Sequence, residues 1–137
     1  MSIVQTQTTS FKSQLYQAVH DLTTDQLYVA LYTGNASLNA STTIYSATNE
    51  VVATGYTAGG QLLTGVTLNT FNYTAYVNFN NAVWGATITA RCALIYNHSK
   101  GDKSIAVLDF GSDKTQTNFT ITMPSNTYTT ALIRSSN

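Results

Sequence analysis

The chain has 137 residues, enough for one domain with a sizeable buried core. Only 9% of its residues are charged, against about 25% in ordinary soluble domains, and six basic residues balance six acidic ones. We therefore expect no nucleic-acid partner, because phosphate binding needs a basic surface, and no membrane partner, because no run of about 18 apolar residues is present. The first 30 residues also lack a basic segment followed by a long apolar one, so we expect synthesis in a cytoplasm.

The N-terminal region divides into an expected arm and a helix. Residues 1–9 are polar and β-branched without a clear period, and we interpret them as an arm that is ordered only when something docks it. Residues 10–137 are expected to form one β-sandwich domain. That domain starts with an amphipathic helix, since Ser10 is a typical N-cap and apolar residues follow at helical spacing over about three turns. These apolar residues are Phe11, Leu15, Ala18, Val19 and Leu22. His20 is placed in the last turn, where the helix dipole favours a cationic imidazole.

Three strands and a turn are predicted in the next part of the chain. Residues 27–33 alternate between an apolar face and an aromatic face, which is typical of a strand. Residues 44–52 fit a short helical turn or an edge strand equally well. Gly59-Gly60 predicts a turn with positive φ, and no Lys-Ser or Lys-Thr pair follows to make it a phosphate-binding loop. Residues 66–68 and 73–79 predict two further strands.

The centre of the fold is a hairpin predicted over residues 83–110. Two runs rich in β-branched and aromatic residues flank the polar turn NHSKGDKS. Alternation along the first run places Ile88, Ala90, Cys92, Leu94 and Tyr96 on one face. Residues 105–110 show no clearly polar face, so this strand is expected to be covered on both sides. The single cysteine, Cys92, is interpreted as a small buried hydrophobic residue.

The C-terminal part is predicted to finish the sheets. Residues 111–118 are polar and are interpreted as a loop, residues 119–123 as a strand ended by Pro124, and residues 128–134 as the last strand. The whole chain then has about eight short strands and one N-terminal helix. This pattern predicts a mainly β fold, either an antiparallel β-sandwich or a jelly-roll-like barrel.

No convincing catalytic site emerges from the sequence. Asp109, at the end of an apolar strand, is the best single candidate acid, because burial would raise its pKa. The simpler interpretation is that Asp109 or Asp113 forms an ion pair with Lys103, Lys114 or Arg91. A Ser-His-Asp arrangement could include His98 and Asp102, but no serine lies in a G-x-S-x-G elbow. We therefore expect no enzyme, no catalytic residue, no cofactor and no metal site.

Aromatic residues are the most promising interface candidates. Tyrosine and tryptophan combine apolar area with a polar tip, which suits protein interfaces and sugar platforms. Most of the nine tyrosines are expected in the core or the sheets. The candidate interface residues, taken together with the apolar part of the arm, are Ile3, Val4, Tyr28, Tyr32, Tyr56, Tyr76 and Trp84.

Several segments, in this order, carry a resemblance. They are ALYT at 30–33, YSATNEV at 45–51, GYTAGG at 55–60, ATITARCALIYN at 86–97, VLDFGSDK at 107–114 and FTITMP at 119–124. With them the chain resembles a family of small structural proteins encoded by tailed bacteriophages, from about Phe11 to Pro124. The resemblance implies a virion component and gives no catalytic residues.

The leading hypothesis is a capsid decoration or cement protein on the outer surface of the virion head. It would form a homotrimer and bind the major capsid protein, and many weak repeated contacts would hold it there. In this picture residues 1–9 dock on the shell, while strand edges and exposed tyrosines make the trimer contacts. One alternative is a tail- or fibre-associated virion protein. Another is a carbohydrate-binding module for host attachment, in which Trp84 and loop tyrosines stack on a glycan.

Overall fold

The structure, a computed structural model, describes residues 3–136 and is mainly β. In chain order its elements are β1 (Thr6–Gln7), α1 (Thr9–Tyr16), β2 (Leu27–Tyr32), β3 (Gln61–Leu62), β4 (Thr67–Phe71), β5 (Thr74–Asn78), β6 (Ala82–Val83), β7 (Ile88–Asn97), the 3-10 turn η1 (His98–Lys100), β8 (Lys103–Gln116), β9 (Thr120–Ile121) and β10 (Ile133–Ser135). The expected mainly β fold with one N-terminal helix is confirmed.

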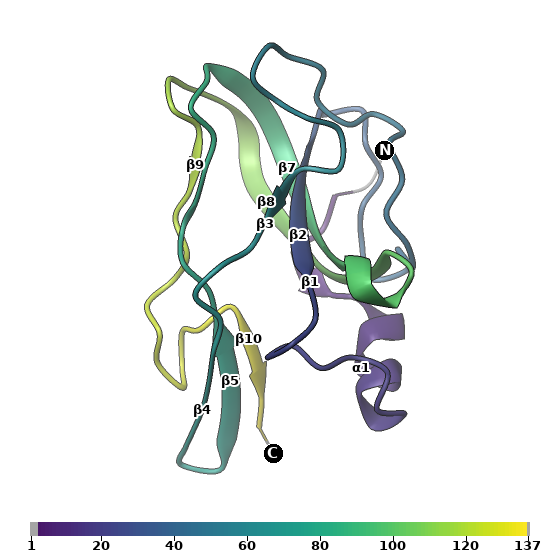
Figure 1. The fold of residues 1–137 in the computed structure, drawn as a ribbon, viewed down its shortest axis with the longest axis vertical. Helices are drawn as coiled ribbons and strands as arrows, with labels where there is room; N and C mark the ends of the chain where they lie inside the picture. The colour runs from purple at the N-terminus through teal and green to yellow at the C-terminus, as the bar shows by residue number, and fades with distance from the viewer. Residues whose placement is uncertain (1–2, 137) are drawn as a thin grey trace.

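The strands form two layers. One layer is a five-stranded sheet in the order β1-β8-β7-β2-β3, and every strand pair in it is antiparallel. The other layer consists of a three-stranded sheet, β10-β5-β4, and a two-stranded sheet, β6-β9. Figure 1 shows the β4–β5 hairpin and β10 at one end of the molecule, with α1 across from them. The arrangement is an antiparallel β-sandwich, as expected.

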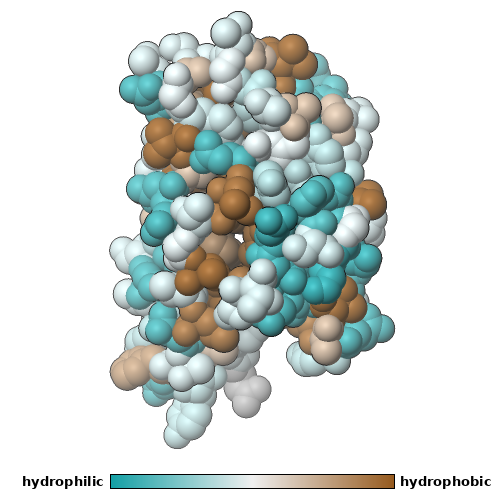
Figure 2. Space-filling model, in the orientation of Figure 1, coloured by the Kyte–Doolittle hydropathy of each residue, from teal (hydrophilic) through white to brown (hydrophobic). Residues whose placement is uncertain are grey.

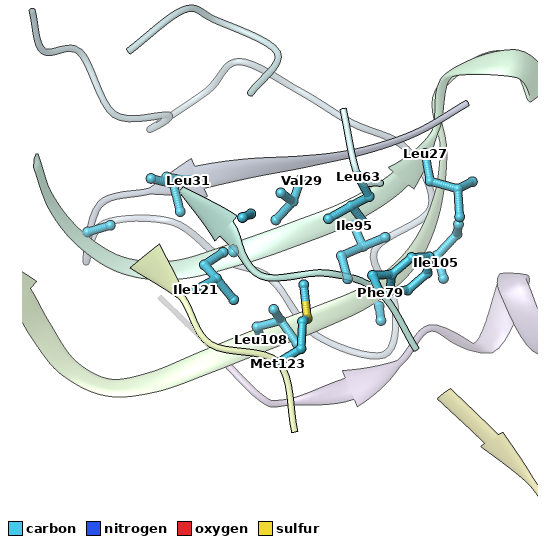
Figure 3. Packing of buried hydrophobic residues seen from close by; sticks show 14 of the residues in the cluster. Leu27, Val29, Leu31, Leu63, Phe79, Ile95, Ile105, Leu108, Ile121 and Met123 are labelled. Atoms are coloured by element: carbon cyan, nitrogen blue, oxygen red, sulfur yellow. The ribbon is translucent and has the colours of Figure 1, made fainter. Parts of the chain in front are cut away.

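The main core lies between the two layers. Val29 and Ile95 of the five-stranded sheet are fully buried and belong to one cluster with Phe79, Ile121 and other residues of the second layer. Figure 3 shows these side chains between the strands that carry them. Because a buried aliphatic side chain contributes about 1.5–3 kcal/mol, this cluster is the main source of stability.

The five-stranded sheet also buries its other face. A smaller cluster on this side includes Tyr32, Cys92, Leu94 and Val107, and Leu38 from the loop after β2 packs against it. The expectation that the strand at residues 105–110 is covered on both sides is confirmed. Cys92 is fully buried, as predicted, and burial raises the pKa of its thiol to about 11.

The predicted central hairpin is β7–β8, but its faces differ from the prediction. The pairing register shifts between Ala90 and Cys92, where β8 carries extra residues around Gly111. Ile88 and Ala90 therefore pack in the main core, whereas Cys92, Leu94 and Tyr96 pack in the smaller cluster. The predicted single face was wrong because a bulge reverses the alternation of side chains beyond it.

The second difference in this hairpin is the length of β8. Residues 111–116, predicted as part of a polar loop, continue β8 and pair with the first residues of β7, Ile88 with Gln116 and Ala90 with Lys114. The side chains of residues 111–116 are exposed, and the hydroxyl groups of Thr89 and Thr115 lie 2.7 Å apart across the strands. Backbone pairing with β7 holds this part of β8, and its side chains are not needed in the core. They can therefore be polar, and the composition resembles that of a loop.

Helix α1 is shorter than predicted. Its N-cap is Thr8, not Ser10, and the Thr8 hydroxyl accepts from the Phe11 N–H at 3.3 Å. The helix ends at Tyr16, because Ala18 adopts a left-handed φ of 58° and the Val19 N–H donates to the Gln14 carbonyl. This is the Schellman arrangement, usually made with glycine. The predicted three-turn helix was wrong for this reason.

His20 consequently lies outside the helix, where its side chain is buried. Burial, the largest effect, lowers the pKa of His20 below its usual 6.5. Its Nδ1 lies 2.9 Å from the Asn97 amide nitrogen and its Nε2 lies 2.8 Å from Gln14 Oε1. A neutral imidazole that accepts at Nδ1 and donates from Nε2 satisfies both contacts. The expected cationic helix-end histidine is therefore replaced by a neutral buried one.

The described part of the expected arm, residues 3–9, lies along the domain itself. Ile3 forms a parallel bridge with Leu38, and Thr6 and Gln7 pair with Val107 and Ala106 of β8. Thr8 is fully buried. This segment is ordered on the sheet of its own domain. The sandwich therefore includes residues before position 10.

The remaining predicted elements are present in part. Residues 44–52 form neither a helical turn nor a strand, although Ile44 and Glu50 each make one isolated bridge. The two strands predicted at 66–68 and 73–79 correspond to β4 and β5. The last two predicted strands shorten to β9 and β10, because the chain around them is held by turns and side-chain bonds.

Candidate interaction surface

The second layer is almost free of charge. Residues 51–90 and 115–133 contain no Asp, Glu, Lys, Arg or His. These two segments supply β4, β5, β6 and β9 and the first residue of β10, so Arg134 is the one charged residue in the strands of this layer. A surface of this kind does not repel a like surface and is insensitive to salt.

The β4–β5 hairpin exposes the largest apolar side chains of this layer. All five residues of β4 are exposed, with Leu68 54% and Phe71 58% accessible. Tyr73, at the tip of the hairpin, is 95% accessible. Val83 of β6 is exposed as well. Apolar side chains this open on a chain without nearby charges are typical of a protein contact.

Tyr73 occupies a strained position. Asn72 and Tyr73 form the two-residue turn between β4 and β5, with φ values of 50° and 68°. Positive φ at both positions defines a type I′ turn, where glycine or asparagine is favoured. Asparagine tolerates this conformation, but a tyrosine costs roughly 1–2 kcal/mol in it. A fully exposed aromatic residue at such a position is a candidate contact residue.

An apolar groove lies on the inner side of the hairpin. It has a volume of about 480 Å³ and runs between the three-stranded sheet and the chain after α1. Its apolar lining comes from Leu15, Leu22, Leu68, Ala75, Val77 and Ile133, and its polar lining includes His20 and Asp21. Figure 2 shows a band of apolar surface in the hollow at the centre of this face. Leu68 belongs to both the groove and the outer strand β4.

The predicted interface residues divide into two groups. Val4 is exposed, and Ile3, Tyr28 and Tyr76 are partly exposed, so the geometry leaves these four free for contacts. Tyr32, Tyr56 and Trp84 lie in the core instead. Trp84 is only 4% accessible and packs between Tyr56 and Phe119. Its expected role as a surface platform is therefore corrected, because its ring is covered on both sides.

The two buried tyrosines find partners for their hydroxyl groups. The Tyr56 hydroxyl donates to Glu50 Oε2 at 2.5 Å and accepts from the Leu31 N–H at 2.9 Å. Burial and Glu50 raise the pKa of Tyr56 well above its usual value. The Tyr32 hydroxyl donates to the Ser46 carbonyl at 2.7 Å. These bonds remove the cost of burying a hydroxyl group, so both residues serve the fold.

Glu50 is a buried carboxylate at the centre of this network. Tyr45 donates to Oε1 at 2.5 Å, and the Gly59 N–H donates to Oε2 at 2.8 Å. With the bond from Tyr56, three donors neutralise its burial cost. The arrangement bonds both carboxylate oxygens and ties the irregular residues 44–60 to the five-stranded sheet.

An aromatic stack lies on the outer face of the five-stranded sheet. Tyr45 stacks on Tyr96 with ring centroids 4.6 Å apart, and Tyr28 also stacks on Tyr96, at 5.9 Å. The His98 ring meets Tyr28 edge-on at 5.3 Å. Because the rings cover one another's faces, the stack does not offer a row of open platforms for sugar rings.

The candidate acid Asp109 and the candidate triad residues His98 and Asp102 form ion pairs in the structure. Asp109 forms an ion pair with Arg91, the structural interpretation favoured by the sequence. The Gly111 N–H, which donates to its carboxylate at 2.8 Å, and the Arg91 guanidinium lower the pKa of Asp109, contrary to the rise that burial would give. His98 pairs with Asp102 at 2.8 Å, but no serine hydroxyl within residues 3–136 is bonded to His98.

Within the described residues there is neither a metal-binding cluster nor a helix that could span a membrane. Residues 3–136 contain no group of three or more His, Cys, Asp or Glu side chains placed to hold a metal ion. The one α-helix in that range is too short to cross a membrane. Comparisons of the chain with protein-family models, curated proteins and solved structures find no match.

The sequence reasoning missed the residues that the structure places on the surface of the second layer. The sequence pattern places Leu68 and Tyr73 in expected strands and Phe71 between them, and it marks none of the three as a contact residue. The signal that could have identified them is the run of forty residues without a charge, at positions 51–90. In an ordinary domain such a run would include exposed lysines and glutamates.

Proposed function

We propose that this protein is a capsid decoration protein of a tailed bacteriophage, which binds the major capsid protein on the outer surface of the head. The observation that supports this best is the uncharged second layer, with its exposed apolar hairpin. An isolated monomer gains nothing from such a surface, whereas an assembly subunit covers it. The sequence resemblance to phage structural proteins points to the same class.

A neutral contact surface suits a protein that must stay on a particle outside the cell. Contacts between exposed charges weaken as salt screens them, over a Debye length of about 10 Å at 0.1 M salt. Apolar and backbone contacts keep their strength across these conditions. A modest affinity at each site is sufficient, because contacts to several neighbouring shell subunits add through multivalency.

A binding experiment with shells tests the proposal. Empty capsids from phage that lack this protein are mixed with the purified protein, and bound protein is measured after sedimentation. We expect saturable binding by the wild type and at least tenfold weaker binding by Phe71→Lys. Tyr16→Lys is the matched control, because Tyr16 is 94% accessible and lies outside the second layer.

The control should bind like the wild type. If the wild type does not bind shells, or if Phe71→Lys binds as well as Tyr16→Lys, the proposal is wrong. Binding to purified tails without binding to shells would contradict the proposal and support a tail-associated protein instead.

A further inference from the structure

Strand β4 has the longest unprotected sheet edge in the part of the chain that the structure describes. The outer edge of β8 beyond Val107 is longer, but it carries Asp109, Asp113 and Lys114 and a register shift. The other edge strands, β1, β3, β6, β9 and β10, have two or three residues each, whereas β4 has five. Natural proteins protect long edges with charged residues, proline or a bulge. Residues 67–71, TLNTF, contain neither a charged residue nor a proline, and the pairing of β4 with β5 shows no register shift.

The turn fixes which backbone groups of β4 point outward. In a two-residue hairpin, Phe71 and Thr74 exchange both hydrogen bonds, and the bonded pairs then alternate along the ladder. Phe71, Asn69 and Thr67 therefore bond to β5, while Leu68 and Thr70 direct their N–H and C=O groups away from it. Among residues 3–136 these outward groups have no hydrogen-bond partner.

We propose that β4 pairs antiparallel with β4 of a second copy of this chain, around a two-fold axis at Asn69. In this register Leu68 of each copy lies opposite Thr70 of the other, and these residues exchange the outward bonds. Asn69 meets Asn69 of the second copy as a pair without hydrogen bonds between them. The two three-stranded sheets then join into one continuous six-stranded sheet.

The absence of charge favours a second copy of the chain as the occupant of this edge. A two-fold contact brings each residue close to its own equivalent, so any charge at the centre of the contact meets a like charge. Residues 51–90 contain no charged residue, and the whole chain has a net charge of zero. Two β4 strands can therefore pair without repulsion between like charges. A strand that binds a charged partner would not need to be neutral.

The side chains fit the same register. Leu68 lies on the groove side of β4, so pairing places Thr70 of the second copy beside it and extends the apolar face. On the opposite side, Phe71 lies across from Thr67 of the second copy. Aromatic and β-branched residues are favourable neighbours across antiparallel strands, at roughly 0.2–1 kcal/mol per pair.

This inference does not rest on the proposed function, because it concerns purified protein without shells. If the protein forms trimers through another surface, the β4 contact joins two trimers. A failure of β4 pairing would leave decoration of the shell intact as a proposal, and a failure to bind shells would leave β4 pairing intact.

Disulfide trapping tests the register directly. Opposite residues without hydrogen bonds between them have Cα atoms about 4.5 Å apart, within the range that a disulfide spans. Asn69→Cys should therefore form a covalent dimer rapidly under mild oxidation. Thr67→Cys is the matched control on the same exposed strand, since its equivalents would lie about 14 Å apart at roughly 3.4 Å per residue. The native Cys92 is buried and should not react.

A second variant separates pairing from folding. Thr70→Pro removes an outward N–H that β5 does not use, and Thr70→Val keeps it. By analytical ultracentrifugation we expect Thr70→Pro to raise the dissociation constant of the β4 contact at least tenfold, and Thr70→Val to leave it unchanged. Circular dichroism checks that both variants are folded. Equal cross-linking at positions 67 and 69, no cross-linking at 69, or unchanged association of Thr70→Pro would each overturn the proposal.

Discussion

The hydroxyl groups of Thr8 and Ser104 lie 2.9 Å apart, although 96 residues separate them in the sequence. Both side chains are fully buried. Ser104 also donates to the Thr42 carbonyl at 2.7 Å. The Ser104 hydroxyl, at the start of β8, therefore connects the N-terminal segment with the loop after β2. The segment before α1 is thus part of the fold and not a separable arm.

Replacing Thr8 by alanine should lower the free energy of unfolding by about 1–2 kcal/mol. The variant loses the helix N-cap and leaves the Ser104 hydroxyl with one partner fewer. Urea unfolding measures the change. Thr9→Ala is the control, because Thr9 is exposed on the first turn of α1. Equal stability of both variants and the wild type would contradict the structural role of this segment.

Tyr73→Gly should stabilise the isolated protein by about 1 kcal/mol, because glycine adopts a positive φ without strain. The same change should weaken binding to shells, since it removes a fully open aromatic side chain. Tyr73→Ala separates the two effects, because alanine keeps the strained φ and loses only the ring. A Tyr73→Gly protein that is less stable than the wild type, or that binds shells normally, would contradict the assignment of Tyr73 to a contact.

Gly60→Ala should destabilise the fold by more than about 3 kcal/mol. A Cβ atom at Gly60 would lie 1.9 Å from the Val29 carbonyl oxygen, in the middle of strand β2. Gly111 has a similar φ of +85°, but a Cβ atom there meets nothing within 4 Å. Gly111→Ala should therefore cost only about 1 kcal/mol. Thermal unfolding of the two variants distinguishes steric overlap from backbone strain, and equal losses would contradict the close packing of Gly60 on β2.

Stability should fall as the pH drops below about 6.5. Because burial lowers the pKa of His20 in the folded protein, the unfolded chain binds a proton at a higher pH than the folded one does. Asp25 acts in the opposite direction on this pKa, while Lys100 and Lys103 support the lowering. The pKa of Asp25 itself is lowered below 3.8, so this carboxylate does not affect the range above pH 5.

The measurement is the melting temperature between pH 7.5 and 5.0. The wild type should lose stability over this interval, and His20→Gln should lose clearly less. His98→Gln is the control, because it keeps the buried His20 and replaces an exposed imidazole. Its melting temperature should fall as much as that of the wild type. A wild type whose stability rises on acidification would show that His20 is charged in the folded state.

The sequence was sufficient for the parts of the fold that depend on local alternation. The β7–β8 hairpin and its polar turn follow from two apolar runs around NHSKGDKS. The end of α1 could not be predicted, because Ala18 adopts a conformation usually reserved for glycine. The polar residues 111–116 could not be recognised as strand, because only their pairing with β7 keeps them extended.

The contact surface was harder to predict than the fold. Tyr56 and Trp84 have the composition of interface residues, but whether their rings face solvent depends on which strands cover them. In the same way, Leu68 and Phe71 are exposed only because β4 is an edge strand, which is a property of the sheet order and not of the local sequence. Alternation reveals that a strand has two faces and does not reveal whether it has two neighbours.

The position and copy number of this protein in reconstructed phage particles test the central claim most directly. The proposed function predicts hundreds of copies on the outer surface of the head, with the uncharged second layer against a shell subunit or another copy. Particles without the protein, or with only three, six or twelve copies on the tail, would contradict it.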